Sequence, residues 1–259
     1  MHASVLYNLA FAALVCVVCA VFVSSSAVSL RDLQAANEAL EKQRNVLVAA
    51  GLATSDERPS AAEIAERFNA INQVVIDLDT GEEVAGVDPD LFDQRAAAAG
   101  AETGRPAPDN PARVQRLPRQ ALVYELRDAG GQLDLVILPI NGMGLWSTLY
   151  GFIAIDADLI TVRGITYYEH LETPGLGGEV DNPRWKALWP GRRAFGDDGA
   201  VSIEVIRGRA GAPEADPYRV DGLAGATMTS RGVTNMLHFW LGEHGFRPYL
   251  DRLRGREGA

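Results

Sequence analysis

Residues 121–138 read ALVYELRDAGGQLDLVIL, and they set the architecture of the domain. Two apolar runs, 121–126 and 133–138, flank the glycine-bearing turn at 128–131. Short runs rich in strand-forming residues on either side of such a turn are typical of a β-hairpin. The sequence therefore predicts antiparallel pairing at the centre of the domain.

Segments on both sides of this hairpin extend the sheet and supply helices. Strands are expected at 74–78, 152–155, 160–168 and 201–206. Ser60 and Glu63 form a capping box that opens a helix to about residue 71, a short helix is expected over 183–188, and the last helix begins near Ser230. Residues 85–118 are expected to form a long surface loop with at most one short helix. The pattern predicts an α+β domain with a mixed, largely antiparallel sheet and flanking helices.

The N-terminal segment has the composition of a membrane anchor. Every Lys, Arg, Asp and Glu lies at Arg31 or later, and residues 9–23 are apolar throughout. Residues 9–30, when helical, are long enough to cross the ~30 Å hydrocarbon core of a bilayer. Residues 31–50, rich in Leu, Ala, Glu and Gln, are expected to continue this helix to Gly51. A cleaved signal peptide is the alternative, but no basic residue precedes the apolar run.

Charge and cysteine content exclude several other classes of protein. The formal net charge of −10 repels phosphate backbones and argues against nucleic-acid binding. The chain has two cysteines, Cys16 and Cys19, which are too few for a disulfide scaffold or a four-thiolate metal site. Both lie in the apolar run, where they fill space in a helix or form half of a site that a second protein completes.

Residues 221–233, DGLAGATMTSRGV, carry the strongest chemical signal. Glycines leave backbone N–H groups uncovered, and the start of the following helix adds unpaired N–H donors and a positive dipole end. Three hydroxyls stand at this junction, on Thr227, Thr229 and Ser230. The segment is either a phosphate-binding junction or an ordinary loop in which Ser230 caps a helix.

Residues 221–227 resemble the flavinylation motif Asp-x-x-(Ser/Thr)-Gly-Ala-Thr of FMN-binding domains in membrane-bound redox complexes. In that family a flavin transferase links FMN through its phosphate to the last threonine of the motif, which is Thr227 in this sequence. The Ser/Thr position is occupied here by Ala224, which leaves one hydroxyl fewer for the phosphate or the transferase. The resemblance also implies flavin-binding roles for Asp221, Gly225, Ala226 and Thr229.

Two further segments resemble the C-type subunits of the Na⁺-translocating NADH:quinone reductases. Residues 144–151 read GLWSTLYG, and residues 170–178 read HLETPGLGG. The second segment predicts a flavin wall, in which Leu176 contacts the isoalloxazine ring while Glu172 and Thr173 bind polar atoms of the ring or ribityl chain. A purely structural turn is the alternative.

This resemblance implies a membrane-anchored electron-transfer protein in a complex of six subunits, with the A, B, D, E and F subunits as partners. It would carry covalent FMN, relay electrons from NADH towards ubiquinone coupled to sodium export, and lie in the bacterial inner membrane with its domain on the periplasmic side. Its parts would be an anchor (1–30), a connector and first part of the domain (31–118) and an FMN-binding domain (119–259). No catalytic residue or metal site is predicted within the chain. The G-type subunit of an Rnf ferredoxin:NAD complex, and a non-redox anchored module that binds an anion reversibly, are the alternatives.

The remaining aromatic and titratable residues give weaker signals. His170 is either a proton shuttle or a hydrogen-bonded histidine at a strand end. Trp146 and Tyr150 lie near the flavin or serve as core or interface aromatics. His238 and His244 lack the spacing and the third partner of a zinc site, and Arg192 with Arg193 is expected in a solvated turn.

The N-terminal segment is predicted to remain attached in the mature protein, because a cleavable signal would need a basic residue before its apolar run. N-terminal sequencing of the membrane-extracted chain should therefore start at or next to Met1. A mature chain beginning near Ala27 would refute the anchor.

Overall fold

The computed structural model describes residues 2–257, which form two compact units that divide between Lys42 and Gln43. Residues 1, 258 and 259, which belong to the predicted anchor and FMN-binding domain, lie outside the described residues. Helix α1 (His2–Ala49) contains the first unit, and from Val5 onwards it is long and apolar enough to cross a membrane by length and composition. The helix continues past Arg31 as predicted and ends before Gly51, whose φ is 74°.

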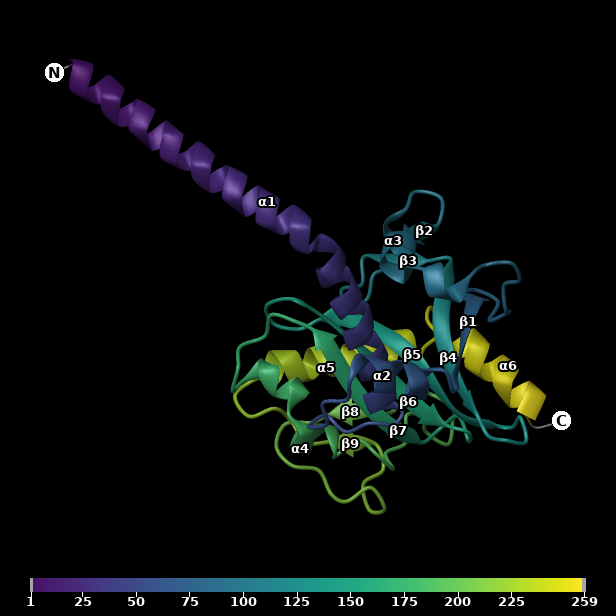
Figure 1. The fold of residues 1–259 in the computed structure, drawn as a ribbon. Coiled ribbons are helices and arrows are strands. Elements are labelled where there is room, and N and C mark those ends of the chain that lie inside the picture. The colour runs from purple at the N-terminus through teal and green to yellow at the C-terminus, as the bar shows by residue number, and fades with distance from the viewer. Residues whose placement is uncertain (1, 258–259) are drawn as a thin grey trace. The chain divides into compact units, whose positions relative to one another are not determined.

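The second unit is built on a five-stranded antiparallel sheet of order β1-β4-β5-β6-β7 (Figure 1). Its strands are β1 (Ile71–Asp77), β4 (Gln120–Arg127), β5 (Leu133–Met143), β6 (Thr148–Asp156) and β7 (Val162–Glu169). The predicted hairpin is confirmed, with Tyr124 opposite Ile137 and a turn closed by the bond from Gly131 N–H to Asp128 O. Both apolar runs are buried at consecutive positions, so side chains pack on both faces of the sheet.

Helix α5 (Thr227–Trp240) packs against β5 and closes the core on that side (Figure 1). Its buried side chains include Val233, Met236, Leu237 and Trp240, at the spacing expected for one helix face. The indole Nε1 of Trp240 donates to the carbonyl oxygen of Asn141 at 2.7 Å, which fixes the register of helix against strand. Towards the start of the helix, Gly232 lies against the carbonyl oxygen of Met143, so the first half of α5 lies beside the end of β5.

Several boundaries differ from the sequence expectations. The capping box of α2 (Ala61–Phe68) is present, but the helix ends at Phe68 and does not reach Ile71. Ile71 is instead the first residue of β1, and its side chain is buried. The short helix α4 spans Pro183–Lys186. Of the strand expected at 201–206, only β8 (Glu204–Val205) forms, paired in parallel with β9 (Arg219–Val220).

Two regions contain more structure than the sequence predicted. The loop at 85–118 holds a 3₁₀ turn η1 (Pro89–Leu91), a helix α3 (Gln94–Ala99) and a hairpin of β2 (Gly104–Pro106) with β3 (Arg116–Pro118). A last helix, α6 (Arg247–Glu257), was not expected after α5. Its charged sequence hides a narrow apolar stripe, in which Tyr249, Leu250 and Leu253 are buried.

Candidate functional site

The glycine loop at 221–226 leads directly into α5, which begins at Thr227 and not near Ser230 as predicted. Gly225 has a φ of 71°, a conformation that favours glycine, and Ala226 precedes the helix without a side-chain cap. The Ser230 hydroxyl accepts a hydrogen bond from Leu223 N–H at 3.0 Å. Ser230 therefore ties the loop to the first turn from inside the helix and does not serve as its N-cap.

Thr227 stands at this junction with a free hydroxyl. Its side chain is exposed, and within residues 2–257 its hydroxyl has no hydrogen-bond partner. In the same described range, no acceptor faces the N–H groups of Thr227, Met228 and Thr229. These donors and the positive end of the helix dipole make the junction suited to an anion.

Thr229, two residues on, is in the opposite situation. Its side chain is fully buried, and its hydroxyl donates to Oε2 of Glu172 at 2.6 Å. A hydroxyl already committed to a buried carboxylate is unavailable for other chemistry. The structure thus separates the two threonines that the motif brings close in sequence.

Glu172 joins three segments of the site. Its carboxylate is buried, and Oε1 accepts the N–H groups of Leu145 (3.0 Å), Trp146 (2.8 Å) and, at 3.4 Å, Ser147. Its second oxygen holds Thr229. These hydrogen bonds satisfy both oxygens of a carboxylate that has little access to water. The turn at 144–147, the loop at 170–178 and the start of α5 are therefore fixed to one another.

Glycines give this carboxylate its space. A Cβ at Gly144 would lie 2.6 Å from Glu172 Oε1, and a Cβ at Gly177 would lie 2.4 Å from Oε2 and 2.6 Å from the Thr229 hydroxyl. Such distances are well inside van der Waals contact. Both glycines belong to the two segments, 144–151 and 170–178, that resemble a flavoprotein family.

The loop at 170–178 also meets the glycine loop directly. Leu176 is exposed, and its Cδ2 lies 2.9 Å from the place of a Cβ on Gly225. Thr173 is exposed, while its carbonyl oxygen accepts the N–H groups of Leu176 and Gly178. The side chains of Thr173 and Leu176 are thus presented to solvent beside the Thr227 junction, by a loop with a defined internal turn.

Asp221 has a structural role on the other side of the glycine loop. Its carboxylate accepts Ala210 N–H at 2.8 Å, and its carbonyl oxygen accepts the indole N–H of Trp185 at 2.8 Å. These bonds hold the glycine loop against the segment at 206–210 and helix α4. Asp221 therefore shapes the loop through its side-chain and backbone hydrogen bonds.

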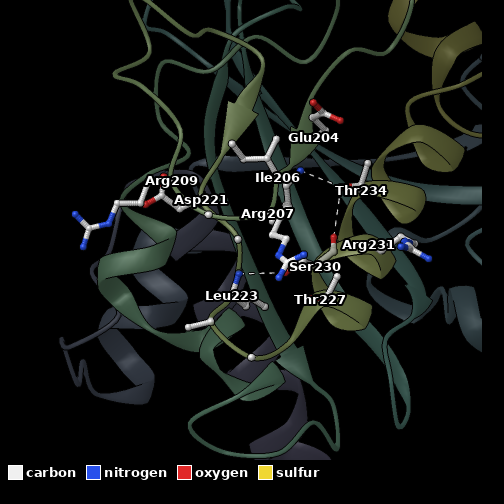
Figure 2. A pocket seen from close by; sticks show the side chains of 15 residues that line it. Glu204, Ile206, Arg207, Arg209, Asp221, Leu223, Thr227, Ser230, Arg231 and Thr234 are labelled. Atoms are coloured by element: carbon white, nitrogen blue, oxygen red, sulfur yellow. Dashed lines mark hydrogen bonds between the residues drawn. The ribbon is translucent and has the colours of Figure 1, made fainter.

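A cavity of about 820 Å³ lies between this segment, the glycine loop and the first turns of α5 (Figure 2). Thr227 and Ser230 line it together with three arginines, Arg207, Arg209 and Arg231. In Figure 2 the side chain of Arg207 extends towards Ser230 at the start of α5. None of the three guanidinium groups has an ion pair or hydrogen bond within the described part of the chain. Sequence reasoning missed Arg207 and Arg209 because they lie in a segment with no recognisable motif, and it gave no role to Arg231 within residues 221–233.

Exposed apolar side chains lie on the segments that Glu172 joins. Seven large apolar side chains are exposed within residues 43–257, and five of them belong to the segments joined by Glu172: Leu145, Trp146, Leu171, Leu176 and Met228. Exposed apolar side chains scattered singly are ordinary, whereas a cluster of them marks a place where something binds. Trp146 is 66% exposed and Leu171 80% exposed.

Comparisons with known proteins give the family. Residues 144–242 match the model of the FMN-binding domain. The chain is 46% identical to the C subunit of the Na(+)-translocating NADH-quinone reductase of Yersinia pestis over 95% of its own length and 91% of that protein's, and 45% identical to the Pseudomonas aeruginosa protein of the same name over 96% of each chain. A crystal structure of Shewanella oneidensis NqrC matches with a TM-score of 0.74 and 35% identity, covering 82% of this chain and 96% of that one.

The chain belongs to the NqrC family, the C subunits of Na⁺-translocating NADH-quinone reductases. This membership confirms the resemblance drawn from the motifs, and with it the α+β fold in which an apolar N-terminal helix precedes an antiparallel sheet domain. It also decides against the Rnf-type alternative, which shares the flavin motif. The protein is thus a subunit of an oxidoreductase complex with an FMN-binding domain.

Other residues singled out from the sequence have structural partners. The guanidinium of Arg95 lies 3.5 Å from the centre of the Tyr150 ring. His238 Nε2 bonds to the carbonyl oxygen of Ile203. The expectation that Arg192 lies in a solvated turn is wrong, because it is buried and donates to the carbonyl oxygens of Leu188 and Asp216. Among the described residues there is no cluster of His, Cys, Asp or Glu suited to a metal ion.

His170 is hydrogen-bonded on both ring nitrogens. Nδ1 accepts Glu172 N–H at 3.2 Å, so the neutral ring carries its proton on Nε2, which lies 2.7 Å from Asp181 Oδ2. The bond to the Asp181 carboxylate raises the pKa of His170 above its ordinary value, although partial burial acts in the other direction.

The Asp181–His170 contact should therefore stabilise the fold in a pH-dependent way. Because the folded-state pKa of His170 is raised, the contribution is fully present below the unfolded pKa of about 6.5 and fades as pH rises through the higher folded value. Melting temperatures of Asp181→Asn should fall short of wild type by more at pH 5.5 than at pH 8.5. Asp197→Asn, which removes an acid paired with Arg193, is the control without a histidine partner and should show no such trend. An equal deficit for Asp181→Asn at both pH values would contradict the assignment.

Proposed function

We propose that this chain carries FMN bound covalently through its phosphate to Thr227, and relays electrons from NADH towards ubiquinone within a complex that exports sodium. Its partners would be the A, B, D, E and F subunits of that complex and, during maturation, a flavin transferase. The helix α1 would anchor it in the bacterial inner membrane with the domain on the periplasmic side. The observation that carries the proposal is the free, exposed hydroxyl of Thr227 at the unpaired N-terminus of α5.

The junction suits a phosphodiester in three ways. The hydroxyl of Thr227 is accessible, the backbone N–H groups of residues 227–229 point out of the first helical turn, and unpaired guanidinium groups line the adjoining cavity. A flavin donor that holds its phosphate in a phosphoanhydride would supply the group. The bond from Thr227 Oγ1 to phosphorus forms as the anhydride bond breaks, and the hydroxyl proton leaves with the displaced phosphate or to solvent.

The flavin ring is assigned to the apolar cluster at 145–146, 171, 176 and 228. Leu176 lies against Gly225, two residues before the attachment point, so a group tethered at Thr227 reaches this surface easily. The Glu172 carboxylate is fully engaged with the turn at 144–147 and with Thr229. Glu172 therefore stabilises the segments that carry the apolar cluster, and Thr173 and backbone groups of the exposed loop make the polar contacts to the flavin.

Bound FMN would supply the one-electron chemistry that links a two-electron donor to carriers that take single electrons. The chain's own residues bind the group, hold it at one place and leave one side of it open. The side chains of the apolar cluster are exposed to solvent in the isolated chain, which suits a group that exchanges electrons with neighbouring subunits. A module that binds an anion reversibly has less support, because it needs neither the free hydroxyl of Thr227 nor the apolar cluster.

Covalent attachment is tested by a matched pair of variants. Thr227→Val should abolish the FMN adduct after co-expression with the transferase and leave stability nearly unchanged, because the side chain is exposed and unpaired. Thr229→Val should keep the adduct but lower the free energy of unfolding by about 1–3 kcal/mol, because it leaves Glu172 short of a donor. Intact mass measures the first effect and chemical denaturation the second.

An adduct retained in Thr227→Val and lost in Thr229→Val would move the attachment site and overturn the assignment. In-gel flavin fluorescence after denaturation gives an independent readout of the same result. It also separates covalent FMN from a reversibly held anion, which would leave the denatured chain dark.

The position of the ring is tested at Leu176. Leu176→Ala should leave FMN incorporation intact and shift the one-electron potential by about 20–60 mV, since 59 mV corresponds to a tenfold change in relative binding of the two redox states. Ile206→Ala, which removes an apolar side chain from the neighbouring cavity, is the control and should leave the potential unchanged. An unchanged potential in Leu176→Ala together with a shift in Ile206→Ala would place the ring in the arginine-lined cavity.

A further inference from the structure

A second cavity, of about 570 Å³, lies at the end of β5 and the start of β6. It is lined by helix α3, residues 113–118, the ends of β5 and β6, Tyr168 of β7 and Trp240 of α5, and it shares no lining residue with the cavity at Thr227. We propose that this cavity is a binding site for a small organic anion with a flat apolar body, of the aromatic carboxylate class.

The charge of the lining carries the first part of the argument. Three arginines line the cavity, Arg95, Arg113 and Arg116, and none of its 18 lining residues is an Asp or Glu, although the chain has 34 of them. In a protein with a net charge of −10, such a surface is a local reversal of sign. A cavity wall of low dielectric strengthens the attraction of an anion to such a group of cations.

Arg113 is the cation most available to a ligand. Its side chain has no hydrogen bond or ion pair within residues 2–257. Its backbone is left-handed, with a φ of 56°, which costs a non-glycine residue about 1–2 kcal/mol. The bonds of Asn110 to its neighbours hold this conformation: Arg113 N–H donates to Asn110 O, and the Asn110 side chain bonds to both backbone groups of Val114. Unfavourable backbone geometry that is held in place is a feature of binding sites.

The positive charges of the other two arginines are neutralised to different degrees by neighbouring groups. Arg116 donates to the carbonyl oxygens of Ala98 and Gly100 and meets no carboxylate among the described residues, so its positive charge is not neutralised. Arg95 is paired with Glu169 at 2.8 Å, yet its Nε is a buried donor without an acceptor in the described part of the chain. The guanidinium fork, planar and always charged, matches the two oxygens of a carboxylate.

The remaining walls select a flat apolar body. Tyr150 and Tyr168, with rings 6.3 Å apart, stand on neighbouring strands, and Trp240, Pro139 and Ile140 complete the apolar lining. Arg95 lies over Tyr150, so a flat ligand meets both aromatic and guanidinium faces. The volume lies within the range of small-molecule sites. A carboxylate on an aromatic ring combines the charge and the shape that this lining accepts.

The probe for this site is 2-naphthoate, with its neutral analogue 2-naphthamide as the charge control. Titration calorimetry on the full chain in a non-ionic detergent, with a detergent blank subtracted, should give saturable 1:1 binding of naphthoate that is about tenfold tighter than that of the amide. Arg113→Gln should weaken naphthoate binding about tenfold, since it removes one carboxylate–guanidinium contact. Arg184→Gln, which removes an exposed arginine on α4, is the matched control and should bind like wild type.

Arg113→Gly serves as the second variant, because glycine suits the left-handed backbone and therefore preserves the fold while removing the guanidinium. Its loss of naphthoate binding should equal that of Arg113→Gln. Absence of saturable naphthoate binding, equal affinities for naphthoate and naphthamide, or unchanged affinity in both Arg113 variants would each overturn the proposal.

Discussion

The buried carboxylate of Glu172 holds the site together. It takes the N–H groups of the 144–147 turn on one oxygen and the Thr229 hydroxyl on the other. A buried carboxylate is tolerated when hydrogen-bond donors surround it, and removing one donor leaves one of its oxygens poorly satisfied. Three segments distant in sequence are consequently locked into a single arrangement, and glycines at 144 and 177 are required to make room for it.

Neighbouring residues in the first turn of α5 have different roles in this arrangement. Thr229 and Ser230 point inwards and satisfy Glu172 and the glycine loop, while Thr227 points out with its hydroxyl unused. A helix places residues two apart on different faces, so one turn of α5 supplies both the structural bonds and the free nucleophile. The apolar side chains of the locked segments are left exposed around that hydroxyl, where a tethered planar group finds a surface to lie on.

The sequence predicted the parts of this protein that local patterns control. The 121–138 hairpin, the Ser60–Glu63 capping box and the apolar N-terminal helix follow from spacing and composition, and each is present. The sequence singled out the glycine loop and the 170–178 segment, and the structure shows that they contact each other through Leu176 and Gly225. Glu172 was expected to contact the flavin, whereas its bonds go to other segments of the chain, which no one-dimensional pattern reveals. Helix α6 was missed because its buried stripe lies among charged residues, and Arg207 and Arg113 because unpaired arginines acquire meaning only from the cavity around them.

In the protein that carries FMN, the first turn of α5 should present Thr227 for attachment while Glu172 holds Thr229 and the surrounding loops. A high-resolution crystal structure of the chain purified after co-expression with its transferase would test both halves at once. We expect continuous density from Thr227 Oγ1 to a phosphorus atom, the flavin ring against Leu176 and Trp146, and Thr229 still bonded to Glu172. Density that joins the phosphate to Thr229, or a flavin bound away from the start of α5, would contradict this arrangement.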